Sequence, residues 1–167
     1  LSFVDGASSV VLDSTYKEYV FTYNNIHAAT DDVEFQFNVS IDGGSNYNVA
    51  KTTTYFRTYN YEDDSDAALG YRTPRDLAQG TGFQALTEGQ GNGNDESCSG
   101  QLTIFNPSDT TFTKHFIARN SMYGRTDYEM DIYVAGYANT TSAVDAVQFK
   151  MSSGNIDAGT ITLYGIT

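Results

Sequence analysis

The chain has 167 residues, 40% of them hydrophobic and 14% aromatic, which fits one globular domain with a sizeable core and excludes a disordered tail. The 21 acidic and 9 basic residues give a formal net charge of −12, which excludes a broad basic surface for nucleic acid and argues against binding to an anionic membrane. With 13 Tyr, 10 Phe, no Trp and only 2 Pro, beside abundant Gly, Thr, Ser and Asn, the composition favours β-structure.

Hydrophobic residues at every second position predict a series of β-strands with one buried face. Tyr19, Phe21 and Tyr23 form the first such set, and residues 33–39 form the most regular one. Residues 147–151 and 161–163 repeat the pattern near the end of the chain. Further strands are expected at residues 1–4, 10–12, 52–59, 83–86, 101–105, 114–118 and 128–134.

Turn-forming residues separate these strands. Asp42, Gly43 and Gly44 predict a tight turn, and Pro107 biases Asn106 away from helix. One helical turn is expected within residues 71–79, while β-branched residues argue against a helix at 143–147. About ten short strands at this spacing predict an all-β protein. We therefore expect an antiparallel two-sheet sandwich, jelly-roll-like, formed as a single domain by residues 1–167.

Two acidic stretches, residues 61–67 and 88–100, are expected to be long loops, which are common places for binding sites. Asp63, Asp64 and Asp66 in the first are weak candidates for Ca²⁺ ligands, as are Asp95 and its neighbours in the second. The spacing in the first stretch lacks the glycine and closing glutamate of an EF-hand loop. We interpret both as solvated acidic loops, and no metal or other cofactor is expected.

Tyr55, Tyr59 and Tyr61 are in phase on one predicted strand, so they share one face of it. They fit a cross-strand aromatic ladder, which we favour, or exposed rings that stack on sugars. The same alternatives apply to three later tyrosines, Tyr123, Tyr128 and Tyr137. If the second alternative holds, the residues contacting carbohydrate or a host surface would be Tyr59, Tyr61, Asn92 and Asn94.

No catalytic residue is expected. Cys98 is the only cysteine, so it forms no intrachain disulfide, and a loop or core thiol is its simplest interpretation. The only histidines, His27 and His115, are interpreted as partly buried hydrogen-bonding groups, and no serine lies in a G-x-S-x-G pattern. Carboxylates are numerous, but position in the sequence alone cannot pair them across a fold, as a glycosidase requires. A polysaccharide depolymerase is therefore only a distant alternative.

The end of the chain resembles the closing signature of a family of marine phage proteins, some of them from viruses of cyanobacteria. In that signature a strand ending in Ser-Ser-Gly-Asn-Ile, here residues 152–156, leads through a glycine turn to a last strand ending in Leu-Tyr-Gly, here residues 163–165. Similar segments lie at residues 2–6, 13–19, 25–31 and 103–108. The resemblance thus extends over most of the chain.

The resemblance implies a non-catalytic structural protein of a bacteriophage virion, in the tail, a fibre or a capsid decoration, that is assembled in the bacterial host cytoplasm. Expected partners are other virion proteins and copies of the chain itself, with a trimer preferred by analogy with phage fibres. Host surface glycans are a further possible partner, and a lectin-like module is the alternative function. Neither nucleic acid nor membrane insertion is expected. Because the chain starts at Leu1 and directly with a strand, an upstream segment is also expected.

Overall fold

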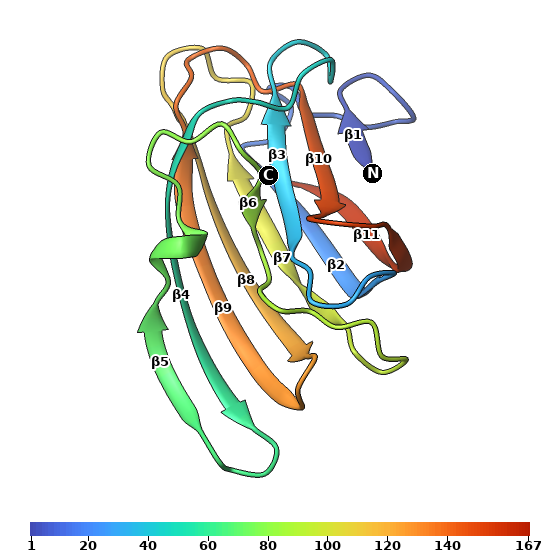
Figure 1. Ribbon diagram of the computed structural model, residues 1–167. Helices are drawn as coiled ribbons and strands as arrows, with labels where there is room; N and C mark the ends of the chain where they lie inside the picture. The colour runs from blue at the N-terminus through green and yellow to red at the C-terminus, as the bar shows by residue number, and fades with distance from the viewer.

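The computed structural model describes residues 1–167 and shows an all-β, antiparallel two-sheet sandwich of jelly-roll-like form (Figure 1). The smaller sheet has four strands in the order β1-β10-β3-β6, and the larger has seven in the order β11-β2-β7-β8-β9-β4-β5. The bounds are β1 Ser2–Val4, β2 Glu18–Ala28, β3 Phe35–Ser40, β4 Lys51–Tyr61, β5 Ala67–Tyr71, η1 Thr73–Arg75, β6 Gln84–Ala85, β7 Cys98–Phe105, β8 Lys114–Gly124, β9 Tyr128–Ala138, β10 Ala146–Met151 and β11 Ile156–Ile166.

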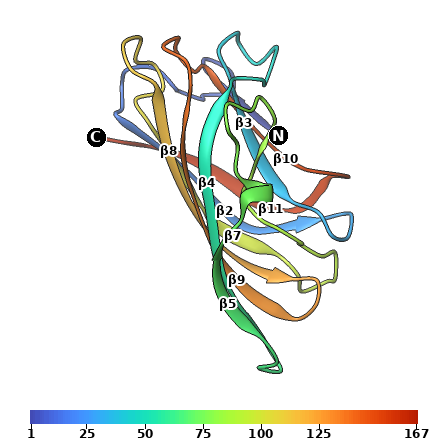
Figure 2. The same cartoon turned by 60° about the vertical axis from the view of Figure 1, so that its left-hand side comes forward.

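The larger sheet extends well beyond the smaller one. The chain passes repeatedly between the sheets, so strands far apart in sequence become neighbours, such as β10 and β3. β6 is only two residues long, and the β4–β5 hairpin and the adjoining ends of β8 and β9 project past it (Figures 1 and 2). Part of the inner face of the larger sheet is therefore not covered by the smaller sheet.

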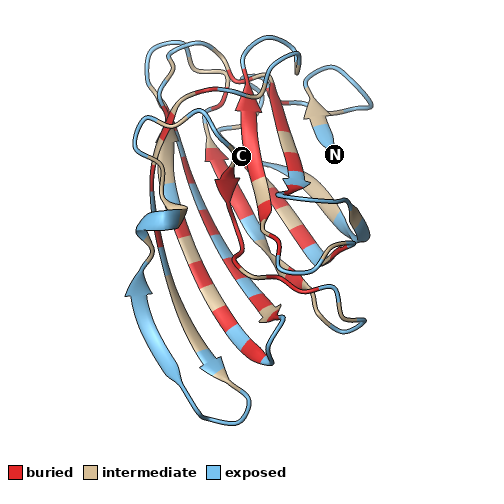
Figure 3. Cartoon of the chain, viewed as in Figure 1, coloured by how far each residue is buried: buried red, intermediate tan, exposed pale blue.

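Aromatic rings fill the space between the sheets, and Figure 3 shows buried residues as bands along the strands of both sheets. Tyr19, Phe21 and Tyr23 of β2 face Phe35 and Phe37 of β3, and all five are fully buried. They belong to a single core cluster of 29 buried residues. The period-two pattern of the sequence thus corresponds to the inner faces of both sheets.

Two buried lysines, Lys51 of β4 and Lys114 of β8, lie at one level of the larger sheet, because both pair with Ala138 of β9. The Lys51 ammonium group donates to Asn38 Oδ1 at 2.5 Å and to Val49 O at 2.9 Å. No ion pair joins Lys51 to a carboxylate, so its charge is balanced by dipoles alone. Burial lowers its pKa from 10.5 to about 8.

Most predicted elements are confirmed. The predicted helical turn within residues 71–79 is the single turn η1, and residues 143–147 form no helix. Ile161 and Leu163 of β11 pack against the core, while Tyr164 and Ile166 are exposed. No helix of the structure is long and apolar enough to cross a membrane.

Three predictions of local structure are wrong. Residues 10–12 form no strand, since the Leu12 N–H donates to the Asp5 carboxylate at 2.8 Å although Leu12 is buried. The strand expected at 33–39 starts at Phe35, and Val33 forms only an isolated bridge with Gln90. Residues 61–67 are a tight hairpin turn, not a long loop, because an unpredicted strand, β5, starts at Ala67.

Candidate functional site

Three tyrosines lie together on the uncovered part of the inner face. Tyr59 and Tyr61 of β4 meet edge to face with ring centroids 5.9 Å apart, and Tyr61 meets Tyr128 of β9 at 5.3 Å. The contact of Tyr61 with Tyr128 across the two strands is part of the predicted aromatic ladder. Tyr59 and Tyr61 are only half-buried. They line a pocket of about 240 Å³ whose residues are Asp32, Arg57, Tyr59, Tyr61, Arg75, Glu88, Gly89, Arg125, Tyr128 and Met130.

Arginines gather at this pocket, which we call the Tyr/Arg pocket. Arg57, Arg75 and Arg125 line it, and Arg72 forms a charge-assisted pair with Glu88 on its wall. Four of the five arginines of the chain thus surround one pocket of a protein with net charge −12. Glu88 also contacts Arg57, and two further pairs join Arg75 to Glu34 and Arg125 to Asp32, both at 2.9 Å.

Arg57 is the most buried of these arginines, and few of its hydrogen-bond donors are satisfied. Its guanidinium lies over the Tyr59 ring at 4.7 Å from the centroid, and its side chain is only 17% exposed. Its Nε lies 3.3 Å from Glu88 but without hydrogen-bond geometry, and its one hydrogen bond is a 3.9 Å contact to the Met130 sulfur. A guanidinium has five N–H donors, so most of the donor capacity of Arg57 is unused.

The pocket combines groups suited to hold a polar ring. Three tyrosines line it, the guanidinium groups can donate hydrogen bonds, and the carboxylates of Glu88 and Asp32 can accept them. At the rim, the Tyr59 hydroxyl donates to Asp66 at 2.7 Å, which raises the pKa of Tyr59. Both carboxylates of the wall are held in ion pairs with arginine.

The four residues proposed from the sequence to contact carbohydrate lie in different places. Tyr59 and Tyr61 line the Tyr/Arg pocket, whereas Asn92 and Asn94 are exposed in the loop before β7. Asn94 lines a second hollow with Asn25, His27, Asp95, Glu96, Ser97, Asp157 and Ala158. The structure therefore brings together the two tyrosines but not the two asparagines with them.

His27 connects this second hollow to three segments of the chain. From β2, its Nδ1 lies 2.6 Å from Asp157 of β11 and its Nε2 lies 2.9 Å from the Gly93 carbonyl oxygen. Both neighbours accept hydrogen bonds, so both ring nitrogens are best used as donors in the imidazolium form. The Asp157 hydrogen bond, with a further contribution from Gly93, therefore raises the pKa of His27.

We expect the His27 contacts to stabilise the fold mainly in acid. A histidine whose folded pKa is raised contributes fully below its unfolded pKa of ~6.5, and the contribution is lost as pH rises through the folded pKa. His27→Gln should therefore reduce stability by about 1 kcal/mol at pH 5.5 and by less at pH 8.5, a size typical of a partly exposed pair. Urea unfolding at both pH values tests this. His115→Gln is the control, because His115 is exposed and forms no side-chain hydrogen bond, so its predicted partial burial is wrong. An equal loss at both pH values would contradict the assignment.

The weak calcium candidates do not form a metal site. Asp63, Asp64 and Asp66 are exposed in the β4–β5 turn, where Asp63 accepts from the Ser65 N–H at 3.0 Å and Asp66 from Tyr59. No three acidic, histidine or cysteine side chains of the chain are placed to hold a metal ion. The carboxylates of this turn shape the hairpin.

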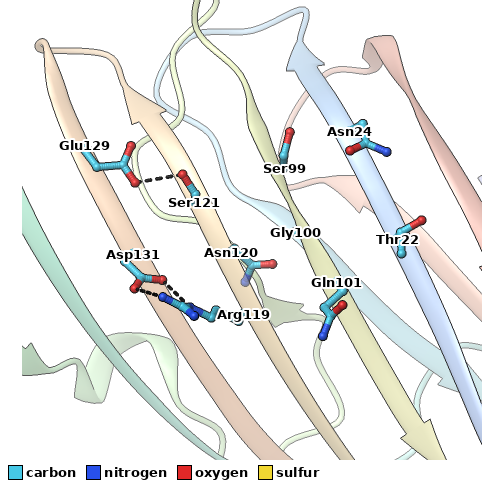
Figure 4. A pocket seen from close by; sticks show the side chains of 10 residues that line it. All are labelled: Thr22, Asn24, Ser99, Gly100, Gln101, Arg119, Asn120, Ser121, Glu129 and Asp131. Atoms are coloured by element: carbon cyan, nitrogen blue, oxygen red, sulfur yellow. Dashed lines mark hydrogen bonds and ion pairs between the residues drawn. The ribbon is translucent and has the colours of Figure 1, made fainter.

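The outer face of the larger sheet carries a wide, shallow hollow of about 650 Å³ with no hydrophobic lining (Figure 4). Two cross-strand pairs cross it, Arg119 with Asp131 at 2.9 Å and the Ser121 hydroxyl with Glu129 at 2.8 Å. Beside it, Phe56 and Tyr133 stack at 4.8 Å with nearly parallel rings. This face thus has a polar half and an aromatic half.

Cys98 is buried in the core, where burial raises the pKa of its thiol, as expected for an inert cysteine. The sequence interpretation missed the arginines of the Tyr/Arg pocket. The available signal was the phase of Arg57, two residues before Tyr59 and therefore on the same face. Arg75, Arg125 and Glu88 come from other segments and gave no such signal.

Comparison of the chain with protein-family models, with curated proteins and with solved structures finds no match to any of them.

Proposed function

We propose that this chain is a non-catalytic structural domain of a bacteriophage virion, in the tail, a fibre or a capsid decoration, that self-associates and contacts the host surface. The similarity of its opening and closing segments to the marine phage family supports the viral assignment. The observation that carries self-association is the edge strand β5, which is exposed along its whole length (Figure 3).

β5 has none of the features that usually protect a sheet edge. Its residues, Ala67–Tyr71, include no charged residue and no proline, and Leu69 and Tyr71 are 71% and 51% exposed. Such an edge offers unpaired backbone groups and apolar side chains to another strand. Tyr71 also extends an apolar row across the sheet, because it pairs with Phe56, which stacks on Tyr133.

The proposed occupant of the β5 edge is a second copy of the chain. The opposite edge of the same sheet is β11, which exposes Tyr164 and Ile166 at 50% and 43%. A closed ring requires two different complementary surfaces on each copy, and these two edges supply them. This favours the trimer over a dimer, in which a single surface would contact itself.

We expect light scattering after gel filtration to give three times the 18.3 kDa mass of the chain. Leu69→Lys, which places a charge on the β5 edge, should convert the trimer to monomer, since lysine is a common protector of natural edges. Phe112→Lys is the matched control, because Phe112 is also 71% exposed but lies in the β7–β8 loop. A monodisperse wild-type monomer at high concentration would refute self-association.

The viral assignment has its own test. Density for this sandwich should be found at the tail, a fibre or the capsid surface of intact particles. Absence of the chain from purified particles would refute the assignment, whatever its oligomeric state.

A further inference from the structure

We propose that the Tyr/Arg pocket binds an acidic sugar, a pyranose ring carrying a carboxylate, within a surface polysaccharide. The proposal rests on the proposed function in one respect: contact with the host surface would supply the sugar. The pocket is on the inner face of the larger sheet, and self-association was assigned to its edges. The two proposals can therefore fail separately.

The shape of the pocket fits one sugar ring. It measures about 240 Å³, lies where the smaller sheet ends, and is bordered by the segment containing Glu88 and Gly89. Tyr59, Tyr61 and Tyr128 come from two neighbouring strands, and β-sheet pairing of Tyr61 with Tyr128 fixes their positions. A preformed tyrosine cluster of this kind meets a ligand at little cost in side-chain entropy.

The charge of the pocket selects an acidic sugar. Among the residues that line the pocket, the guanidinium groups of Arg57, Arg75 and Arg125 outnumber the carboxylates of Glu88 and Asp32, and Asp66 lies at the rim. The chain as a whole carries −12 and repels anions, so an acidic ligand needs a local cationic site. The Tyr/Arg pocket holds most of the arginines of the chain.

Arg57 is the group we assign to the sugar carboxylate. It is mostly buried, is held over Tyr59, and has most of its N–H donors unused. A carboxylate accepts two parallel hydrogen bonds from one guanidinium, and it donates none, so it matches a group with donors only. A neutral sugar would offer hydroxyl groups, which accept more weakly.

The test is titration of the full chain with two oligosaccharides of equal length, oligogalacturonate and its neutral counterpart of galactose, followed by NMR or calorimetry. We expect the acidic oligomer to bind at least tenfold more tightly than the neutral one, and increasing salt to weaken it because the pocket is open to solvent. Arg57→Gln should reduce its affinity at least tenfold. Arg57→Lys should restore only part of it, since lysine keeps the charge but not the planar donor fork.

Arg119→Gln is the matched control. Arg119 also pairs with a carboxylate and lies over a tyrosine ring, 5.0 Å from the Tyr133 centroid, but on the outer face. Its loss should leave affinity unchanged. Tyr61→Ala is a second variant in case Arg57→Gln does not fold. Its own folding is checked by circular dichroism, and it should weaken binding of the acidic oligomer. Equal affinity for both oligomers would overturn the acidic assignment, binding to neither would overturn the sugar site, and an equal loss in Arg119→Gln would overturn its location.

Discussion

Phe149→Ala should destabilise the protein by about 3–5 kcal/mol, the usual cost of removing a buried phenylalanine ring. Phe149 is fully buried on β10 and contacts five other rings. It stacks on Phe35 at a ring-centroid distance of 5.6 Å. Across both sheets it also meets four other rings at centroid distances of 5.4–6.4 Å, those of Phe3, Phe21, Tyr23 and Phe37. Its removal leaves a cavity between the sheets that rigid strands cannot close. Domains of this size have a total stability of ~5–15 kcal/mol, so the variant should lie near the limit of folding.

Urea unfolding of wild type and variant measures the effect, with the slope of the transition checked for constancy. Phe112→Ala is the control, because Phe112 is exposed in a loop and its loss should change stability by less than ~0.5 kcal/mol. Phe149→Leu should recover part of the loss, since leucine fills much of the cavity. A loss below ~1 kcal/mol in Phe149→Ala would mean that the sheets do not pack through this ring.

The sequence predicted the sandwich because its inner faces follow one simple rule. Val33 to Val39 and Tyr19 to Tyr23 alternate without interruption, and a strand with one buried face must do so. The alternation rule fails where a side chain, not a partner strand, binds the backbone N–H groups. Residues 10–12 look like a strand, but the Asp5 carboxylate binds the Leu12 N–H, and no partner strand pairs with them.

β5 was missed for a different reason. Its five residues contain Gly70 and follow an acidic turn, so the local pattern is that of a loop. Its strand conformation comes from pairing with β4, in which Leu69 lies opposite Thr58. Such pairing is a tertiary interaction that no short window of sequence contains.

The candidate site was predictable only in part. The shared face of Tyr59 and Tyr61 follows from their spacing, but their contact with Tyr128 depends on the register of β4 and β9. Arg75 and Arg125 reach the pocket from a segment after β5 and from the β8–β9 turn. A global charge of −12 conceals this local cluster, because the acidic residues that outnumber it lie mostly elsewhere.

Lys51 should make the protein more stable as pH rises from 7.5 to 9.5, the reverse of the effect expected for His27. Burial lowers the pKa of Lys51 to about 8, below the 10.5 of the unfolded chain. Between these values the unfolded state binds more protons, so the free energy of unfolding increases with pH. The full difference corresponds to about 3 kcal/mol, of which about 2 kcal/mol should be regained by pH 9.5.

The test takes the difference in urea unfolding between the wild type and Lys51→Met at each pH, because the buried Cys98, whose thiol pKa is raised by burial, lowers the stability of both over the same range. Relative to Lys51→Met, the wild type should gain about 2 kcal/mol between pH 7.5 and 9.5, and the variant should be at least as stable as wild type at pH 7.5, because a buried unpaired charge is replaced by an apolar side chain. Lys17→Met removes an exposed lysine and must keep the rise, since Lys51 is still present. If both variants rise alike, Lys51 is not the group responsible. The ammonium group would then have enough water or dipoles around it to keep its proton, in contrast to its complete burial beside Asn38.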